Sequence, residues 1–151
     1  MSSGTPPLTS VSIDSVFNGP INCGNGGYIS GLLASFIEGD AEIRINAAFP
    51  VNTPLQVKKT GQGIGAYRDD KLLGSARSIQ LELAIPTPPS LANATAASQR
   101  FSFIHASDPK GCYVCSPLRS ETNGLRVFCG PLKEVVAPQA NIDWPTQIEK
   151  N

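Results

Sequence analysis

The chain lacks the excess of positive charge that nucleic acids and anionic membrane surfaces attract. Its 151 residues include 12 basic and 12 acidic side chains, scattered singly, and the net charge is zero. A basic patch or stripe is the electrostatic footprint of a nucleic-acid-binding or membrane-surface protein, and none is present here. The sequence therefore predicts no nucleic-acid partner and no membrane partner.

Long apolar runs are also missing. A helix needs about 20 apolar residues to cross a bilayer, and no segment of the chain is long enough. The opening segment, MSSGTPPLTS, has neither the basic part nor the apolar part of a secretory signal. We therefore expect a cytoplasmic protein. In that compartment the four cysteines are expected to be thiols or ligands rather than disulfides.

The most informative segment is the glycine-dense stretch FNGPINCGNGGYISGLLASFIEG, residues 17–39. Its Gly24-Asn25-Gly26-Gly27 run allows close approach of the backbone to a ligand, and a helix of about three turns follows directly. The unpaired N–H groups and the positive dipole end at the start of such a helix favour a carbonyl oxygen or an anion. The helix is apolar around most of its circumference, which predicts that a sheet wraps around it. Its small residues Gly31, Ala34 and Ser35 are expected to face that sheet.

Strand patterns dominate the rest of the first half of the chain. A leading strand is expected over residues 10–17, before the helix, and apolar residues alternate over residues 41–49 until Pro50. Residues 54–59 predict a further strand, and residues 61–85 predict a long hairpin that turns at Asp69-Asp70. The glycines of the 61–65 run mark a twisted or bulged strand rather than a nucleotide loop, because no helix follows them.

The second half of the chain gives weaker signals. Residues 90–99 predict a short helix capped by Ser90, and residues 100–106 and 124–130 are strand candidates. We expect one domain over residues 1–151, with its core at about 10–85. The C-terminal strands and a cysteine-containing loop are expected at about 100–138, and an irregular tail at 139–151.

A strand, a buried helix and then an antiparallel sheet form the element order of the α+β hot-dog fold, in which the sheet wraps around one central helix. Several short motifs, in one order over residues 10–138, also resemble the thioesterase-like hot-dog proteins of bacteria. These motifs are Phe17-Asn18-Gly19-Pro20, Gly24-Asn25-Gly26-Gly27-Tyr28, Asn52-Thr53-Pro54-Leu55, and His105…Cys112-Tyr113-Val114-Cys115…Gly124-Leu125-Arg126-Val127-Phe128.

The resemblance implies hydrolysis or binding of an acyl thioester of coenzyme A or of a carrier protein, with no cofactor. Two features depart from the family pattern. Ser116 stands where many relatives have glycine, and the sequence stops at Asn151 where many continue into a second hot-dog half. Hot-dog units normally pack in pairs with the site at their seam, so we expect a homodimer with the ligand at that seam.

Thioester chemistry needs donors for the negative charge that develops on the carbonyl oxygen. The amides of Gly26, Gly27 and Tyr28 are the predicted donors, and Asn25 or Asp14 is the candidate to position or activate water. Asn25 is equally an ordinary helix N-cap, and Asp14 an ordinary solvated residue. Glu38 and Asp40 belong to the far end of the helix, so they could serve only from the partner subunit. Asn18 and His105 are candidate ligand contacts.

The Cys112-x-x-Cys115 motif has three readings. With Cys129 and His105 it offers four zinc ligands, although this spacing matches no common zinc finger. A redox pair is a second reading, but Ser116-Pro117 predicts a turn rather than the helix that such pairs usually precede. The third reading is a pair of partly buried thiols in a tight loop.

Two functions therefore remain open from the sequence. One is an acyl-thioester hydrolase, and the other is a non-catalytic protein of the same fold that binds an acyl or small apolar ligand. The glycine-rich helix start favours the hydrolase, whereas the missing general base favours the binding protein. A zinc-stabilised interaction module built on residues 105–129 is a third, less supported idea.

Overall fold

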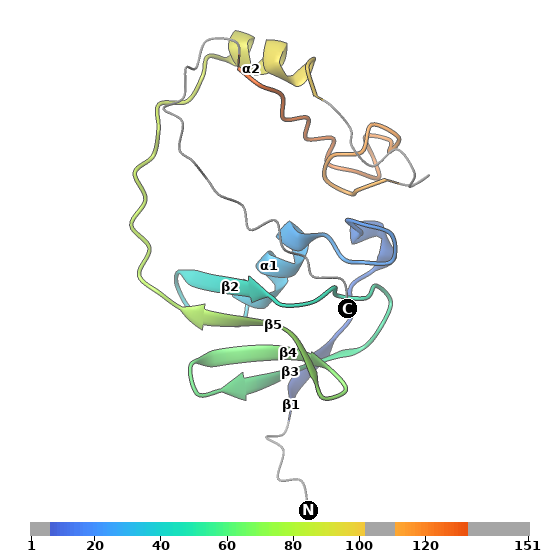
Figure 1. Cartoon of the computed structure of the whole chain (residues 1–151), viewed down its shortest axis with the longest axis vertical. Helices are drawn as coiled ribbons and strands as arrows, with labels where there is room; N and C mark the ends of the chain where they lie inside the picture. The colour runs from blue at the N-terminus through green and yellow to red at the C-terminus, as the bar shows by residue number, and fades with distance from the viewer. Residues whose placement is uncertain (1–6, 102–110, 133–151) are drawn as a thin grey trace, which may run out of the picture.

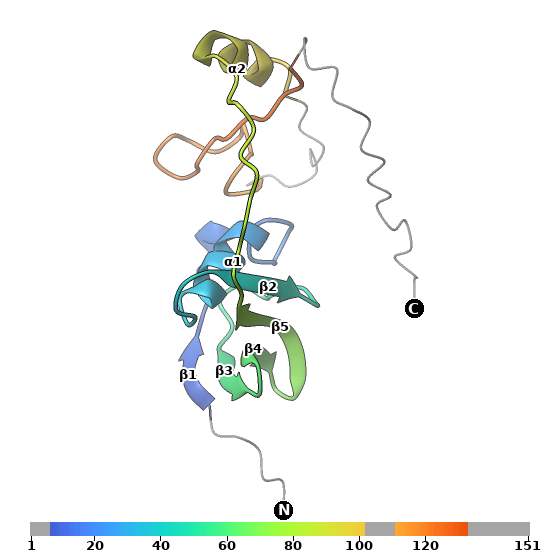
Figure 2. The ribbon, with the colours of Figure 1, turned by 90° about the vertical axis from the view of Figure 1, so that its left-hand side faces the viewer.

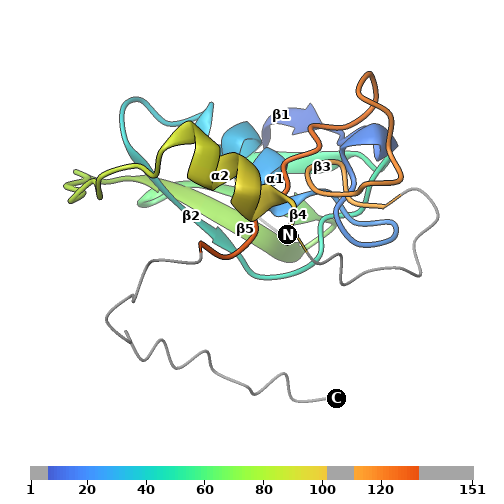
Figure 3. The same cartoon turned by 90° about the horizontal axis from the view of Figure 1, so that it is seen from above.

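A computed structural model of the chain describes residues 7–101 and 111–132. A five-stranded sheet and helix α1 (Gly26–Ala34) form two layers, with α1 on one face of the sheet (Figures 1 and 2). Helix α2 (Leu91–Ser98) and residues 111–132 lie beyond α1, on the side away from the sheet. Viewed from above, the orange loop within residues 111–132 lies over the segment that leads into α1, whereas the red end of this range lies by α2 (Figure 3). The α+β class predicted from the sequence is confirmed.

The sheet is antiparallel, with the strand order β1-β3-β4-β5-β2. The two strands that flank α1 in the sequence, β1 and β2, therefore lie at opposite edges of the sheet. Asp69 adopts a φ of 54° at the predicted turn between β4 and β5. The strands are β1 (Pro7–Val11), β2 (Ala41–Ile45), β3 (Leu55–Thr60), β4 (Gly63–Arg68) and β5 (Lys71–Ser78).

The leading strand is shorter than the predicted 10–17. It ends at Val11, and residues Ser15–Phe17 form a single 3₁₀ turn, η1. The cause is local, because the carboxylate of Asp14 accepts a hydrogen bond from the amide of Val16 at 2.8 Å and so caps this turn. The prediction that the leading strand continues over residues 12–17 was therefore wrong.

Helix α1 packs on the sheet through Ile29 and Leu33, which are buried in the core against Phe49, Leu55 and Val57. The prediction that small residues face the sheet was wrong. Gly31 is exposed, with open space where a Cβ would lie, and Ser35 is exposed as well. The sheet covers one side of α1, whereas the apolar side chains on its flanks remain only partly buried: Tyr28, Leu32, Phe36 and Ile37.

The predicted hairpin over residues 61–85 is also shorter than expected. Strand β5 ends at Ser78, which pairs with Ala41, the first residue of β2. Residues 79–85 continue the alternating apolar pattern, but no strand among the described residues lies opposite them. Leu83 and Ile85 are consequently 71% and 87% exposed.

The segment after the sheet contains α2, whose predicted cap is confirmed: Ser90 Oγ accepts a hydrogen bond from the amide of Asn93 at 3.2 Å. Residues 124–130, a predicted strand, are not one; Leu125 and Val127 donate backbone hydrogen bonds to the 113–114 turn instead. Of the other predicted elements, residues 102–106 and the tail from 139 lie outside the described residues. Within the described ranges, no helix has the length and hydropathy needed to span a bilayer.

Candidate functional site

The start of α1 has the capped geometry that its sequence predicts. Asn25 is the N-cap, and its Oδ1 accepts hydrogen bonds from the amides of Gly27 at 2.9 Å and Tyr28 at 3.2 Å. An Asn at this position satisfies amides that have no partner within the helix. Two of the three predicted oxyanion donors are therefore already occupied by the cap.

The amide of Gly26 is the donor that remains. No group among the described residues accepts a hydrogen bond from it, and both Gly26 and Gly27 are exposed. A Cβ placed on Gly26 would meet only the side chain of Ile45, at 3.8 Å. The helix start therefore offers one open N–H group, at the positive end of the helix dipole, to a ligand arriving from solvent.

A distant segment of the chain closes over this helix start. The amide of Tyr113 donates to the carbonyl of Asn18 at 2.8 Å, which brings the Cys112-x-x-Cys115 turn against the loop before α1. Asn25 Nδ2 in turn donates to Cys112 Sγ at 3.5 Å. The same Asn25 side chain thus caps α1 through its oxygen and contacts a thiol through its nitrogen.

The Cys112 and Cys115 thiols differ in their tendency to ionise. Burial opposes ionisation of Cys112, but hydrogen bonds to its sulfur from the amides of Cys115 and Val114, the Cys115 thiol and Asn25 outweigh it, and its pKa lies below the usual value. Burial, together with the hydrogen bond to Cys112 and the charge of that thiolate, raises the pKa of Cys115 to about 11. One thiol of the pair is therefore the preferred thiolate and the other holds its proton.

Arg119 anchors the C-terminal loop, and nothing in the sequence pattern had singled it out. Its side chain is buried, at 6% exposure, and donates to the carbonyl of Gly111 at 3.1 Å and to the carbonyl of Asn123 at 2.8 Å. It also donates to Asn18 Oδ1 in the loop before α1. The predicted ligand contact Asn18 thus has a structural role, holding two loops together.

Aromatic rings fill the space between these loops. Phe17 and Tyr28 stack with ring centroids 4.1 Å apart, and Tyr113 meets Phe17 edge-on at 5.0 Å. The guanidinium of Arg119 lies 5.8 Å from the Tyr113 ring centroid. Offset-stacked and edge-to-face pairs of this kind add stability beyond the area they bury, so the helix start is held rigidly.

Asp14 does not join this cluster. Its carboxylate caps η1, and its residue lines an open cleft of about 510 Å³ together with Ser15, Arg119 and Asn123. No described carboxylate contacts the start of α1. The other predicted ligand contact, His105, lies outside the described residues.

Of the four ligands in the predicted zinc site, His105 lies outside the described residues, and the three cysteines do not gather into one cluster. No group of three or more His, Cys, Asp or Glu side chains gathers among the residues that the structure describes. Cys129 is exposed, and its neighbours Phe128 and Gly130 contact residues at the end of α2. Cys112 and Cys115 are both partly buried in a tight turn, as the third reading of the motif predicts.

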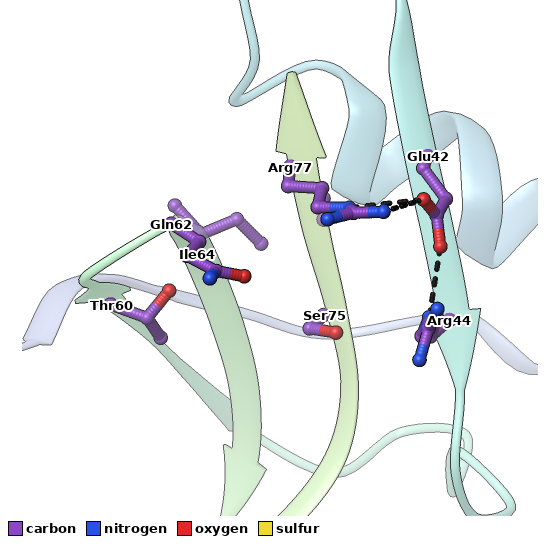
Figure 4. Close-up of a pocket in the computed structure, with 8 residues that line it drawn as sticks. Glu42, Arg44, Thr60, Gln62, Ile64, Ser75 and Arg77 are labelled. Carbon is purple, nitrogen blue, oxygen red and sulfur yellow. Dashed lines mark hydrogen bonds and ion pairs between the residues drawn. The ribbon is translucent and has the colours of Figure 1, made fainter. Parts of the chain in front are cut away.

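A second hollow lies on the sheet and is unrelated to the predicted site residues. It measures about 90 Å³. Glu42 bridges two arginines beside it, contacting Arg77 at 2.5 Å and Arg44 at 2.8 Å (Figure 4). The hydrogen bonds from Arg77 and then Arg44 hold the pKa of Glu42 below its ordinary value. These exposed charges satisfy one another and present no unpaired acid for catalysis.

Comparisons of this chain with protein-family models, with curated proteins and with solved structures found no match.

Proposed function

We propose that this chain is a hot-dog protein that acts on an acyl thioester of coenzyme A or of a carrier protein, as a homodimer. The element order supports this proposal: one strand, one helix and four further strands, with the helix on one face of an antiparallel sheet. The two strands flanking the helix lie at opposite edges of that sheet, so the connection through the helix crosses one face of the sheet.

The observation that carries the proposal is the open amide of Gly26. A thioester carbonyl placed before α1 would accept a hydrogen bond from this N–H in a field that favours negative charge. The exposed Gly26-Gly27 pair leaves room for a ligand to approach, because neither residue has a side chain. Residues 111–116 form one wall beside this point, through the Asn25–Cys112 contact.

Partly uncovered apolar surface supports the dimer. The flank of α1 away from the sheet is only half-buried, and both edge strands, β1 and β2, lack a further neighbour among the described residues. An open sheet edge and an apolar patch are the surfaces that a second copy covers in a two-fold dimer. Large exposed apolar side chains lie on both edge strands, Leu8 on β1 and Ile45 on β2, and in the segment after β5, where they are Leu81, Leu83 and Ile85.

A binding protein of the same fold is the second candidate, and two observations favour it. Asn25 already occupies the amides of Gly27 and Tyr28, which leaves one donor where hydrolases usually direct two. The described residues also place no carboxylate at the helix start to activate water. Such a protein would hold the acyl group without cleaving it.

A proline substitution at Gly26 tests the role of this amide. Proline lacks the N–H but suits the first position of a helix, and Asn25 already has the extended conformation, with φ −65° and ψ 134°, that precedes proline. Gly26→Ala keeps the N–H and is the matched control. Hydrolysis of short, long and aromatic acyl-CoAs is followed by release of free thiol.

For a hydrolase we expect Gly26→Pro to lower kcat by about 100-fold or more, the usual cost of one oxyanion donor, and Gly26→Ala to retain activity. For a binding protein no thiol is released, and a non-hydrolysable acyl-CoA analogue binds to wild type and Gly26→Ala more tightly than to Gly26→Pro. Equal behaviour of the two variants in both assays would contradict a ligand site at the helix start.

A further inference from the structure

The Cys112-x-x-Cys115 turn contains a thiol pair that the proposed function does not use. The amide of Ser116 donates to the carbonyl of Cys112 at 3.0 Å, so residues 112–116 form one closed turn. A turn closed by a bond between residues four apart is a single helical turn, in which the Cα atoms of the first and fourth residues lie about 5 Å apart, within the range that a disulfide spans. The two thiols are close enough for each to influence the ionisation of the other.

The surroundings of the pair favour one thiolate. Cys112 Sγ receives the Asn25 Nδ2 donor at 3.5 Å, as well as the amides of Val114 and Cys115. Both cysteines are partly exposed, so a small oxidant reaches them from solvent. A partly exposed thiol that accepts several hydrogen bonds, next to a second thiol that remains protonated, is the arrangement of a reactive and a resolving cysteine.

We propose that Cys112 and Cys115 are a modification site for hydrogen peroxide, in which Cys112 reacts first and Cys115 resolves it to an intramolecular disulfide. The Cys112 thiolate attacks one peroxide oxygen, the O–O bond breaks, and the leaving hydroxide takes up a proton to become water. Cys112 is then a sulfenic acid. The Cys115 thiol attacks its sulfur, the S–S bond forms and the S–O bond breaks, releasing the second water. The two thiols thus supply the two electrons that reduce one peroxide.

This inference stands independently of acyl-thioester chemistry. It needs only the turn, the two sulfurs and the donors around Cys112. Oxidation would also remove the charge on Cys112 and weaken its hydrogen bond from Asn25. The redox state of the pair would therefore affect the N-cap of α1.

The test begins with fully reduced, chelator-treated full-length protein exposed to hydrogen peroxide, blocked with N-ethylmaleimide and digested with trypsin. Cleavage after Lys110 and Arg119 releases residues 111–119, which hold both cysteines of the pair. We expect this peptide to lose two hydrogens and to resist alkylation before Cys129 reacts. Cys129 is the internal control because it is the more exposed thiol. Oxidation of Cys129 first, or a disulfide that joins Cys129 to the pair, would overturn the proposal.

Three variants separate the roles. Cys115→Ser should trap a sulfenic acid on Cys112, detected with dimedone, whereas Cys112→Ser should leave Cys115 reduced. Asn25→Asp retains a helix cap but replaces the Nδ2 donor with a carboxylate, so we expect Cys112 to react about tenfold more slowly. An unchanged rate in Asn25→Asp, or dimedone labelling of Cys115 in Cys112→Ser, would contradict the assigned roles. A zinc ion bound to the pair in native mass spectra of the untreated protein would also overturn the proposal.

Discussion

Replacing Arg119 tests whether the C-terminal loop is an integral part of the fold. Arg119→Met keeps most of the apolar stem of the side chain but removes the guanidinium and its hydrogen bonds to Gly111, Asn123 and Asn18. Asn18 is itself buried, at 8% exposure. The substitution therefore removes hydrogen bonds to a charged group and takes a partner away from a buried oxygen.

The expected loss follows from these contacts. A hydrogen bond to a charged group contributes about 1.5–3 kcal/mol. The bonds share one side chain and are not additive, so we expect a loss of about 3 kcal/mol in the free energy of unfolding. For a chain of this size that corresponds to a fall in Tm of about 6–12 °C.

Thermal unfolding followed by far-UV circular dichroism measures this change. Arg100→Met is the matched control, because Arg100 also donates to backbone carbonyls, those of Pro131 and Ala96, but in an exposed setting. We expect that control to lose less than about 1 kcal/mol. The Tm of Arg119→Lys should be close to that of Arg119→Met, since an ammonium group cannot reproduce the planar arrangement of guanidinium donors.

Hydrogen exchange locates the effect. The amides of Tyr113, Leu125 and Val127 donate within or from the C-terminal loop and should lose protection in Arg119→Met. If the Tm of Arg119→Met equals that of Arg100→Met and these amides keep their protection, the loop does not depend on Arg119 and the reasoning fails.

The other predictions concern the core, the helix cap and one ion pair. Leu33→Ala should lower the free energy of unfolding in urea by about 2–5 kcal/mol because Leu33 is fully buried, whereas Leu91→Ala, at an 84% exposed position, should leave it nearly unchanged; similar losses would contradict the described core. Asn25→Ala should cost about 1 kcal/mol and Asn25→Asp less, and equal losses would argue against the cap. Arg77 is the main cause of the lowered pKa of Glu42, so ionised Glu42 stabilises the fold above its unfolded pKa of about 4.5. Glu42→Gln should therefore have a lower Tm than wild type at neutral pH, and the difference should disappear as the pH falls through the lowered pKa; a difference that persists in acid would refute this cause.

The sequence predicted the local features of this fold well, because they depend on neighbouring residues. The Asn25 cap, the Ser90 cap and the Asp69-Asp70 turn each follow from side-chain chemistry within a few positions of the chain. Strand β3 at Leu55–Thr60 follows from its alternating pattern and the preceding Pro54. Whether the complete arrangement is the hot-dog fold stays a prediction.

The strand predictions were wrong where strand formation depends on a neighbouring strand to pair with. Residues 79–85 alternate as a strand should, but β2 begins at Ala41, opposite Ser78, and leaves nothing for them to pair with. Residues 124–130 have a strand-like composition and instead form hydrogen bonds to a turn. Periodicity along one segment carries no information about whether a neighbour is present.

The candidate site shows the same division. The glycines and the asparagine at the start of α1 predicted a helix start that a ligand can approach, and Gly26 is exposed there. The role of Arg119 could not be predicted from the sequence, because its contact with Asn18 joins positions 101 residues apart. The Asn25–Cys112 contact, over 87 residues, was equally hidden.

The junction between Asn18 and residues 113–119 has a consequence for how the chain folds. The sheet and α1 are complete by residue 78, and the loop before α1 is by then bonded to residues 49–52, yet Asn18 in that loop receives two further hydrogen bonds from Tyr113 and Arg119. Contacts of such long sequence separation are slow to form because the intervening chain must first be ordered. During synthesis the sheet would therefore emerge and pair first, and the hydrogen bonds from Tyr113 and Arg119 to Asn18 would form last. The proposed ligand site at the start of α1 would then be completed only at the end of folding.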